Sequence, residues 1–241
     1  MENRLRGLGI EIAFLAAFLL IIVFLWQHPF WSFFAAAALT IIAFQKWKSY
    51  EDRIFFFVCG IVGFAGEVVC IKYGAWTYSN PVLLGVPLWE PLMWGFLGMT
   101  AHRIQQTVFS LEHKDRIRKL THGTVRDIVY DLSMMGIVIA LVSSLWRNDQ
   151  LLFIVLLLLG ICNVLIFHHP RDLFFIFISP AMLLLFEPLA VSSGAWTYPS
   201  PVVFGVPLWL FSAYFCFCLL FGRLGMTASA LYETYKRRPS P

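Results

Sequence analysis

Charged residues are scarce in this sequence. Asp, Glu, Lys and Arg make up only 13% of its 241 residues, whereas hydrophobic residues make up 59%, and the mean hydropathy is +0.75. Soluble domains contain about 25% charged residues, so this composition excludes an ordinary soluble domain. The net charge of +4 lies in short segments between apolar runs, which is the pattern of membrane topology signals and excludes a nucleic-acid-binding surface.

Motifs that bind metals, phosphate groups or disulfide partners are also missing. The sequence has no H-E-x-x-H, no phosphate-binding glycine loop, no G-x-S-x-G and no C-x-x-C, and its histidines do not form the boxes of membrane di-iron enzymes. We therefore expect no metal and no cofactor. The five cysteines are interpreted as small buried thiols: Cys59, Cys70, Cys162, Cys216 and Cys218.

A long internal repeat is the main feature that the sequence does contain. GAWTYSNPVLLGVPLW (residues 74–89) and GAWTYPSPVVFGVPLW (residues 194–209) are identical at twelve of sixteen positions, at an offset of 120. The same offset pairs acidic residues elsewhere in the chain: Glu67 with Glu187, Asp52 with Asp172, and Glu11 with Asp131. A match of this length at a constant offset predicts that the two halves are copies of one structural unit.

Eight apolar segments are long enough to be membrane-spanning helices, some of them short. They are residues 8–26, 30–44, 54–71 and 87–108 in the first half, and 128–146, 151–167, 173–191 and 207–226 in the second. The first follows a basic leader but carries Glu11 and has a counterpart in the second half, so we expect a retained span. The sequence predicts an all-α integral membrane protein with about eight transmembrane helices in two parallel four-helix repeats. Residues 1–111 form the first repeat, 112–127 a cytoplasmic linker, and 128–241 the second repeat with a basic C-terminal tail.

Lys and Arg residues predict the orientation of the chain. They gather at the N-terminus, near residue 48, in the linker and in the C-terminal tail, whereas the alternate connections hold only Lys72 and Arg147. Because cytoplasmic loops collect positive charge, we expect both termini in the cytoplasm and both GAWTY loops on the opposite side. Four spans per repeat give both repeats the same orientation. We expect a multi-pass protein of a bacterial inner membrane.

Glu67 and Glu187 are the main candidates for chemistry. Each lies deep in an apolar segment, where intramembrane carboxyl groups usually face a bundle interior or a cavity. Burial favours the neutral, protonated form, which could act as a proton donor. The structural alternative is that each glutamate accepts hydrogen bonds from the GAWTY loop of its own repeat and fixes that loop.

Glu90 distinguishes the two repeats. It follows the GVPLW sequence of the first repeat, where the second repeat has Leu210. Glu90 is interpreted either as a partner of Glu67 or as a first-turn acid favoured by the helix dipole. We expect Asp52 and Asp172 to cap or begin helices, and Glu11 and Asp131 to have structural roles near the cytoplasmic headgroups.

Six aromatic residues accompany these acids in the repeated loops. One interpretation is an ordinary aromatic belt at the membrane interface. The other is the wall of a substrate pocket, in which aromatic faces stabilise a developing cation. The six residues are Trp76, Tyr78, Trp89, Trp196, Tyr198 and Trp209.

The pattern E-x6-G-x-W-x-Y, followed by G-V-P, resembles the membrane carotenoid family of small bacterial and archaeal lycopene cyclases and related carotenoid hydratases. The resemblance rests on Glu67, Gly74, Trp76, Tyr78, Gly85, Val86, Pro87 and Trp94, and on Glu187, Gly194, Trp196, Tyr198, Gly205 and Pro207. That family carries paired acids after the proline. Here Trp89 replaces the first acid, and Trp209 and Leu210 replace both in the second repeat. The resemblance implies protonation of a polyene double bond, followed by ring closure or capture of water, without a metal.

These observations together favour a membrane-embedded acid–base enzyme acting on a carotenoid or other isoprenoid lipid. Glu67 would donate the proton, Glu90 would be its partner or orient water, and Glu187 would be a second acid or a structural anchor. The alternative is a non-enzymatic transporter or lipid-binding membrane protein, and a purely structural subunit also stays open. The expected partners are the membrane and an apolar lipid, with no nucleic acid, while the oligomeric state is not predicted.

Overall fold

The computed structural model describes residues 2–109, 124–167 and 172–236. Part of the expected linker (residues 112–123) and the end of the C-terminal tail (residues 237–241) lie outside these ranges. The described residues form eight long helices and two short strands. The first half contains α1 (Glu2–Leu25), α2 (Pro29–Lys46), α3 (Tyr50–Lys72), β1 (Thr77–Tyr78) and α4 (Glu90–Phe109). The second contains α6 (Val125–Leu145), α7 (Asp149–Phe167), α8 (Asp172–Ser193), β2 (Trp196–Thr197) and α9 (Trp209–Lys236).

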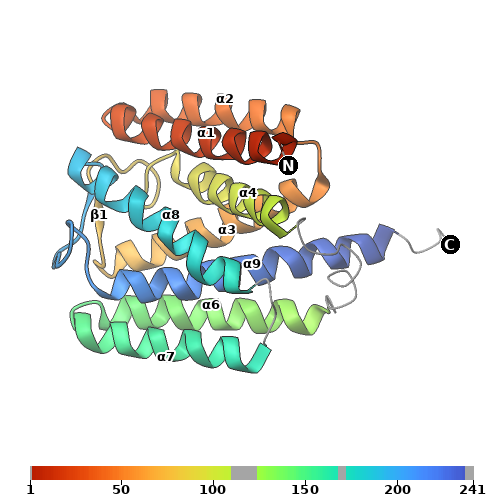
Figure 1. Cartoon of the computed structure of the whole chain (residues 1–241). Helices are drawn as coiled ribbons and strands as arrows, with labels where there is room; N and C mark the ends of the chain where they lie inside the picture. The colour runs from red at the N-terminus through yellow and green to blue at the C-terminus, as the bar shows by residue number, and fades with distance from the viewer. Residues whose placement is uncertain (1, 110–123, 168–171, 237–241) are drawn as a thin grey trace.

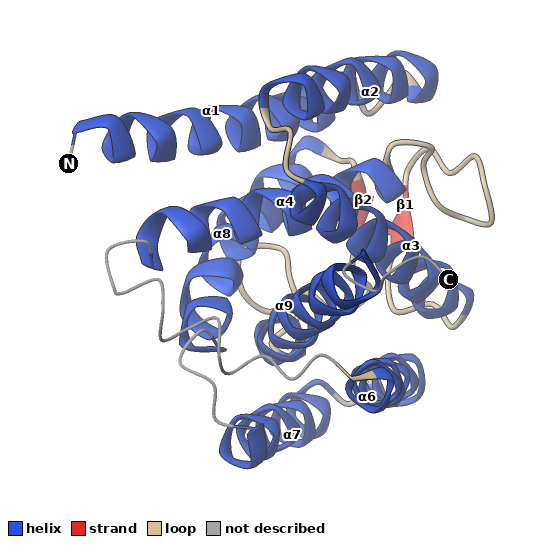
Figure 2. Ribbon diagram, turned by 90° about the vertical axis from the view of Figure 1, so that its right-hand side faces the viewer, coloured by secondary structure: helices blue, strands red, loops and turns tan. Residues whose placement is uncertain are grey.

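Equivalent helices of the two halves occupy equivalent positions in the bundle. The pairs α1–α2 and α6–α7 lie on opposite outer sides, with α3, α4, α8 and α9 between them (Figures 1 and 2). Helix α1 packs on α4 of its own half and on α8 of the other half, and α6 correspondingly packs on α9 and on α3. Each half therefore packs its first helix against the other half. The structure confirms the expected helical membrane fold of two four-helix repeats.

Six of the described helices are long and apolar enough to cross a membrane, by length and composition. They are α1 from Arg6, α2, α3, α6, α7 up to Ile166, and α9. Helix α4, the fourth expected span, is 20 residues long but has a polar C-terminal half. Helix α8 runs through Pro180 and Pro188 without interruption, so the broken helix that would favour a transporter does not occur there.

Both repeated loops leave their helix in the same way. Gly74 has a φ of +81° and Gly194 a φ of +88°, a conformation that residues with a side chain rarely adopt. The amide of Gly74 donates to the carbonyl of Ile71, and that of Ala75 to the carbonyl of Cys70. This is a Schellman motif, which ends a helix and turns the chain sharply. The following residues are thereby directed back over the end of the bundle.

Strands β1 and β2 then join the two loops. They pair antiparallel, with Thr77 opposite Thr197 and Tyr78 opposite Trp196. In each loop the next residues form a tight hairpin, whose tip has positive φ at Leu84 and Gly85 in the first repeat. The pairing holds the aromatic residues of both loops at one end of the bundle, where the candidate site lies.

Candidate functional site: a pocket between the two repeats

Glu67 accepts three hydrogen bonds from aromatic side chains of its own repeat. Its Oε2 accepts from the indole N–H of Trp76 at 2.9 Å and from the hydroxyl of Tyr78 at 3.1 Å. Its Oε1 accepts from the indole N–H of Trp94, on α4, at 3.2 Å. The Schellman turn brings Trp76 and Tyr78 back over α3, which makes two of these contacts possible. The carboxyl group thus ties the loop and α4 to α3.

Glu187 has the same surroundings in the second repeat. Its Oε2 accepts from Trp196 at 2.9 Å and from Tyr198 at 3.0 Å, and its Oε1 accepts from the hydroxyl of Tyr214 on α9. Burial, and then the neighbouring carboxyl group, raises the pKa of Tyr198 well above its ordinary value, and burial does the same for Tyr78. Both hydroxyl groups therefore stay protonated and can donate.

Tyr214 and Trp94 are related by the repeat offset of 120, although one is a phenol and the other an indole. Each donates to Oε1 of the glutamate in its own repeat. Tyr214 was absent from the sequence-based candidates because it lies outside the GAWTY motif. Applying the offset of 120 to Trp94 would have found it.

The two clusters interlock across the boundary between the repeats. The ring of Trp76 lies 6.1 Å from that of Tyr198 and 6.3 Å from that of Trp209. The ring of Trp196 lies 5.6 Å from that of Tyr78 and 6.2 Å from that of Trp89. Aromatic pairs at such separations are stabilising, so each loop packs on its partner rather than on lipid.

All six aromatic residues that the sequence analysis selected are buried. An aromatic belt on the outer surface is therefore the wrong interpretation for them. Five of the six line the central pocket described next, and Trp89 is the exception.

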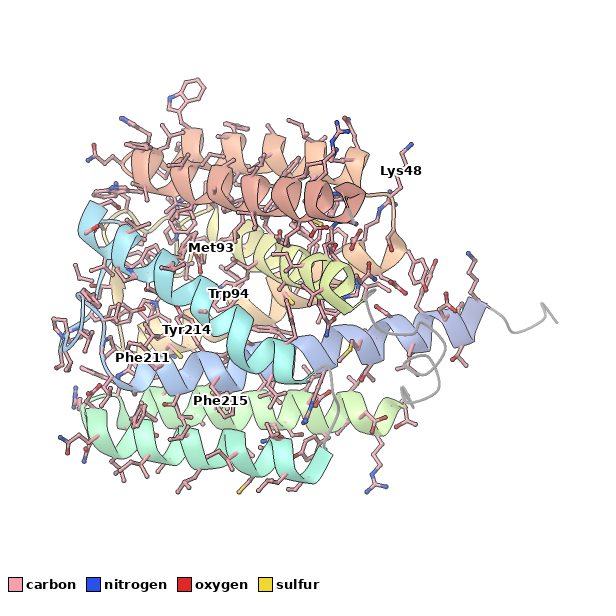
Figure 3. The ribbon with its side chains drawn as sticks, viewed as in Figure 1. Lys48, Met93, Trp94, Phe211, Tyr214 and Phe215 are labelled. Carbon is pink, nitrogen blue, oxygen red and sulfur yellow. The ribbon has the colours of Figure 1, made fainter. Side chains whose placement is uncertain are left out.

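The central pocket lies between α3, α4, α6, α8 and α9 and is partly open to the outside. Figure 3 labels Met93 and Trp94 of α4 and Tyr214 of α9, which project into the interior between these helices. Its polar lining comes from Glu67, Glu187 and their aromatic donors, and the remaining walls are mainly apolar. Both repeats contribute, so the pocket exists only in the assembled bundle.

Glu90 is buried at the start of α4, with 0% of its surface exposed. Among the described residues neither of its carboxyl oxygens has a hydrogen-bond partner. The carboxyl group interacts electrostatically with Glu67 and Glu187. Glu90 does not itself line the central pocket, but Leu210, its equivalent in the second repeat, does.

A separate polar cluster lies at the end of the first repeat opposite the paired loops. The guanidinium of Arg103 lies 2.9 Å from Asp52 Oδ2 and 3.3 Å from Glu11 Oε1, and it stacks 4.6 Å from the centre of the Trp47 ring. Ser49 caps α3, so Asp52 lies in the first turn, as predicted, and forms an ion pair as well. Sequence analysis did not find this cluster, because residues from three helices form it.

The hydrogen bonds of Glu67 and Glu187 are those expected if each glutamate fixes the GAWTY loop of its own repeat. Each carboxyl group accepts its hydrogen bonds from the loop and the fourth helix of its own repeat. Glu67, Glu90 and Glu187 do come close enough to interact electrostatically. Their assignment as catalytic residues stays a prediction.

No protein-family model matches this chain, and no curated protein sequence matches it either. Two solved structures match in fold. They are the mycobacterial Insig homologue MvINS from Mycobacterium vanbaalenii and a cross-linked MvINS trimer. Each has a TM-score of 0.61 and 17% sequence identity over 79% of this chain and 97% of the MvINS chain.

This result corrects the sequence-based resemblance. The structures that share the fold are those of an Insig homologue, not of a carotenoid cyclase or hydratase, so the assignment to the carotenoid family is wrong. The E-x6-G-x-W-x-Y pattern was misleading because glycine, proline and aromatic residues recur in many membrane-protein loops, where they form turns and packing contacts. At 17% identity the likeness extends to the fold alone: the chain is a multi-span membrane protein with the helical architecture seen in MvINS.

Proposed function

We propose that this protein binds a lipid in the central pocket, within the plane of the membrane. The proposal rests chiefly on one observation, which is that the pocket combines apolar walls with a few polar groups supplied by both repeats. Ligand sites in helical bundles commonly have this composition. A hydrocarbon tail would contact the apolar walls, and a polar head would lie near the two glutamates.

The position of the pocket supports a lipid rather than a water-soluble ligand. Glu67 lies five residues before the end of α3 and Glu187 six residues before the end of α8. At 1.5 Å per residue, both carboxyl groups lie about 8 Å from the helix ends. That depth places a polar head close to the headgroups and lets a tail extend towards the middle of the bilayer.

The membrane orientation belongs to the same proposal. Basic residues at the N-terminal end of α1 and at the end of α9 support a cytoplasmic location of both termini. The paired loops and the pocket then lie near the opposite face of a bacterial inner membrane. A ligand would enter from the outer leaflet.

Lipid extraction from the purified protein, followed by mass spectrometry, tests the proposal. We expect a lipid that stays with the protein through exchange into neutral detergent. In Leu97→Trp the larger side chain fills the pocket that Leu97 lines, so the retained lipid should fall by at least about tenfold.

Leu165→Trp is the matched control, because Leu165 is 70% exposed on the outer face of α7. It should leave the retained lipid unchanged. Equal lipid content in the two variants, with both folded, would contradict binding in the central pocket.

A further inference from the structure

The lining of the central pocket is acidic and contains no compensating base. Among the described residues that line it are two glutamates and no lysine, arginine or histidine. The other polar groups that contact the two glutamates are neutral indoles and phenols. Such donors stabilise a carboxylate but do not neutralise it.

Glu90 adds a third buried carboxyl group beside these two. Its nearest polar neighbours are Glu67, Tyr78 and Glu187, of which Tyr78 and Glu67 lie near hydrogen-bonding range, and none of the three is a cation. A buried carboxyl group without a well-formed hydrogen bond is energetically unfavourable. Glu90 does not line the pocket, but a positive charge on a ligand beside Glu67 would attract the Glu90 carboxylate through the protein.

Aromatic rings surround the acids. Trp76, Tyr78, Trp196, Tyr198 and Trp209 line the pocket together with Trp94 and Tyr214. Aromatic faces attract cations, and cages of aromatic residues recognise ammonium and quaternary ammonium groups. Acidic and aromatic groups in one pocket therefore select the same kind of ligand.

We propose that the lipid in the central pocket carries a positively charged head group, an ammonium or quaternary ammonium, on a hydrocarbon tail. This rests on the proposed function and adds the chemical class of the ligand. The head group lies on the side of the first repeat, near Glu67 and Glu90, because the second repeat has Leu210 in place of Glu90. The tail lies along the apolar side chains of α6 and α9, which include Met135, Ile139 and Phe217.

Three probes with the same tail test this inference. Dodecylammonium, dodecyltrimethylammonium and dodecanol are titrated below micelle-forming concentrations into the purified protein in a neutral detergent. Quenching of tryptophan fluorescence reports binding, because four tryptophans line the pocket. We expect at least one cationic probe to bind about tenfold or more tighter than dodecanol.

Glu90→Gln and Glu90→Leu show whether the acids cause this preference. Leu is the residue that the second repeat has at this position, and Gln keeps the size and the hydrogen-bonding capacity of the side chain while removing its charge. Both should reduce the preference for the cationic probes at least about fivefold and leave dodecanol binding unchanged. Glu51→Gln removes a carboxyl group in the first turn of α3 instead, far from the pocket, and it should leave the preference intact.

The possible outcomes separate the two proposals. If dodecanol binds as tightly as both cations, or if the preference survives in both Glu90 variants, the inference about charge is wrong and lipid binding still stands. If no probe binds and no lipid is retained during purification, the proposed function is wrong as well.

Discussion

The hydroxyl oxygens of Thr77 and Thr197 lie 3.2 Å apart across the β1–β2 pair. These residues are equivalent in the two repeats, so each meets its own counterpart. Only residues beside a two-fold rotation axis can do so. The axis passes between the two loops, at the end of the bundle that holds the candidate site, and this arrangement agrees with repeats that cross the membrane in the same direction.

This contact predicts a disulfide bond. In a Cys162→Ser background, Thr77→Cys combined with Thr197→Cys should form a bond within the chain on mild oxidation, because residues directly opposite in an antiparallel pair have suitable Cβ separations. The shift in electrophoretic mobility between oxidised and reduced samples measures it. Thr77→Cys with Val202→Cys, which lies further along the second loop, should stay reduced. Equal oxidation of the two pairs would argue against the register between the strands.

The phenol hydroxyls of Tyr78 and Tyr198 should contribute similarly to stability. Tyr78→Phe and Tyr198→Phe each remove one of three donors to a buried carboxyl group. Each change should lower the free energy of unfolding by about 1–3 kcal/mol. Unfolding in mixed micelles with increasing SDS measures this effect. Tyr235→Phe, at a residue that is 76% exposed, should have no measurable effect, and a similar loss there would show that the assay does not report these hydrogen bonds.

Arg103 should be important for the stability of the first repeat. Arg103→Leu leaves the buried carboxyl groups of Asp52 and Glu11 without their cation. Because an uncompensated buried charge is strongly destabilising, the free energy of unfolding should fall by about 3 kcal/mol.

A second substitution tests whether unpaired carboxylate charge causes the loss of stability in Arg103→Leu. Adding Asp52→Asn to Arg103→Leu should recover part of the lost stability, since one of the two charges is then removed. Arg53→Leu, at the exposed neighbouring position of α3, should change stability by less than about 0.5 kcal/mol. If the changes in the free energy of unfolding caused by Asp52→Asn and by Arg103→Leu simply add in the double variant, the ion pair is contradicted.

Close packing of α3 on α4 depends on glycine at position 60. A Cβ atom there would lie 2.8 Å from the carbonyl oxygen of Pro91, a backbone atom that cannot move aside easily. Gly60→Ala should therefore force the helices apart and lower the free energy of unfolding by about 1–3 kcal/mol. Gly136→Ala, in α6, meets nothing within 4 Å and should leave stability unchanged or slightly raised. Thermal unfolding in detergent compares the two, and equal midpoints would contradict the close approach.

Part of the candidate site could be predicted from the repeat. Because Glu67 and Glu187 recur at the offset that relates the GAWTY loops, their contact with those loops was one of the expected alternatives. The choice between an aromatic belt and a buried pocket could not be made from sequence, since tryptophan and tyrosine suit both environments. Burial of Trp76 and Trp196 depends on the pairing of β1 with β2, which joins segments 120 residues apart.

The sequence by itself determined the eight helical segments and the duplication, because hydropathy and repetition are local properties that segment length and composition report directly. Only the tertiary structure decided which side chains meet. Trp94 and Tyr214 contact the glutamates through helix packing. Glu90 is buried without a hydrogen-bond partner among the described residues. The family resemblance failed for the same physical reason: short motifs of glycine, proline and aromatic residues specify turns and packing surfaces, whereas the chemistry of a pocket depends on the charges brought together around it.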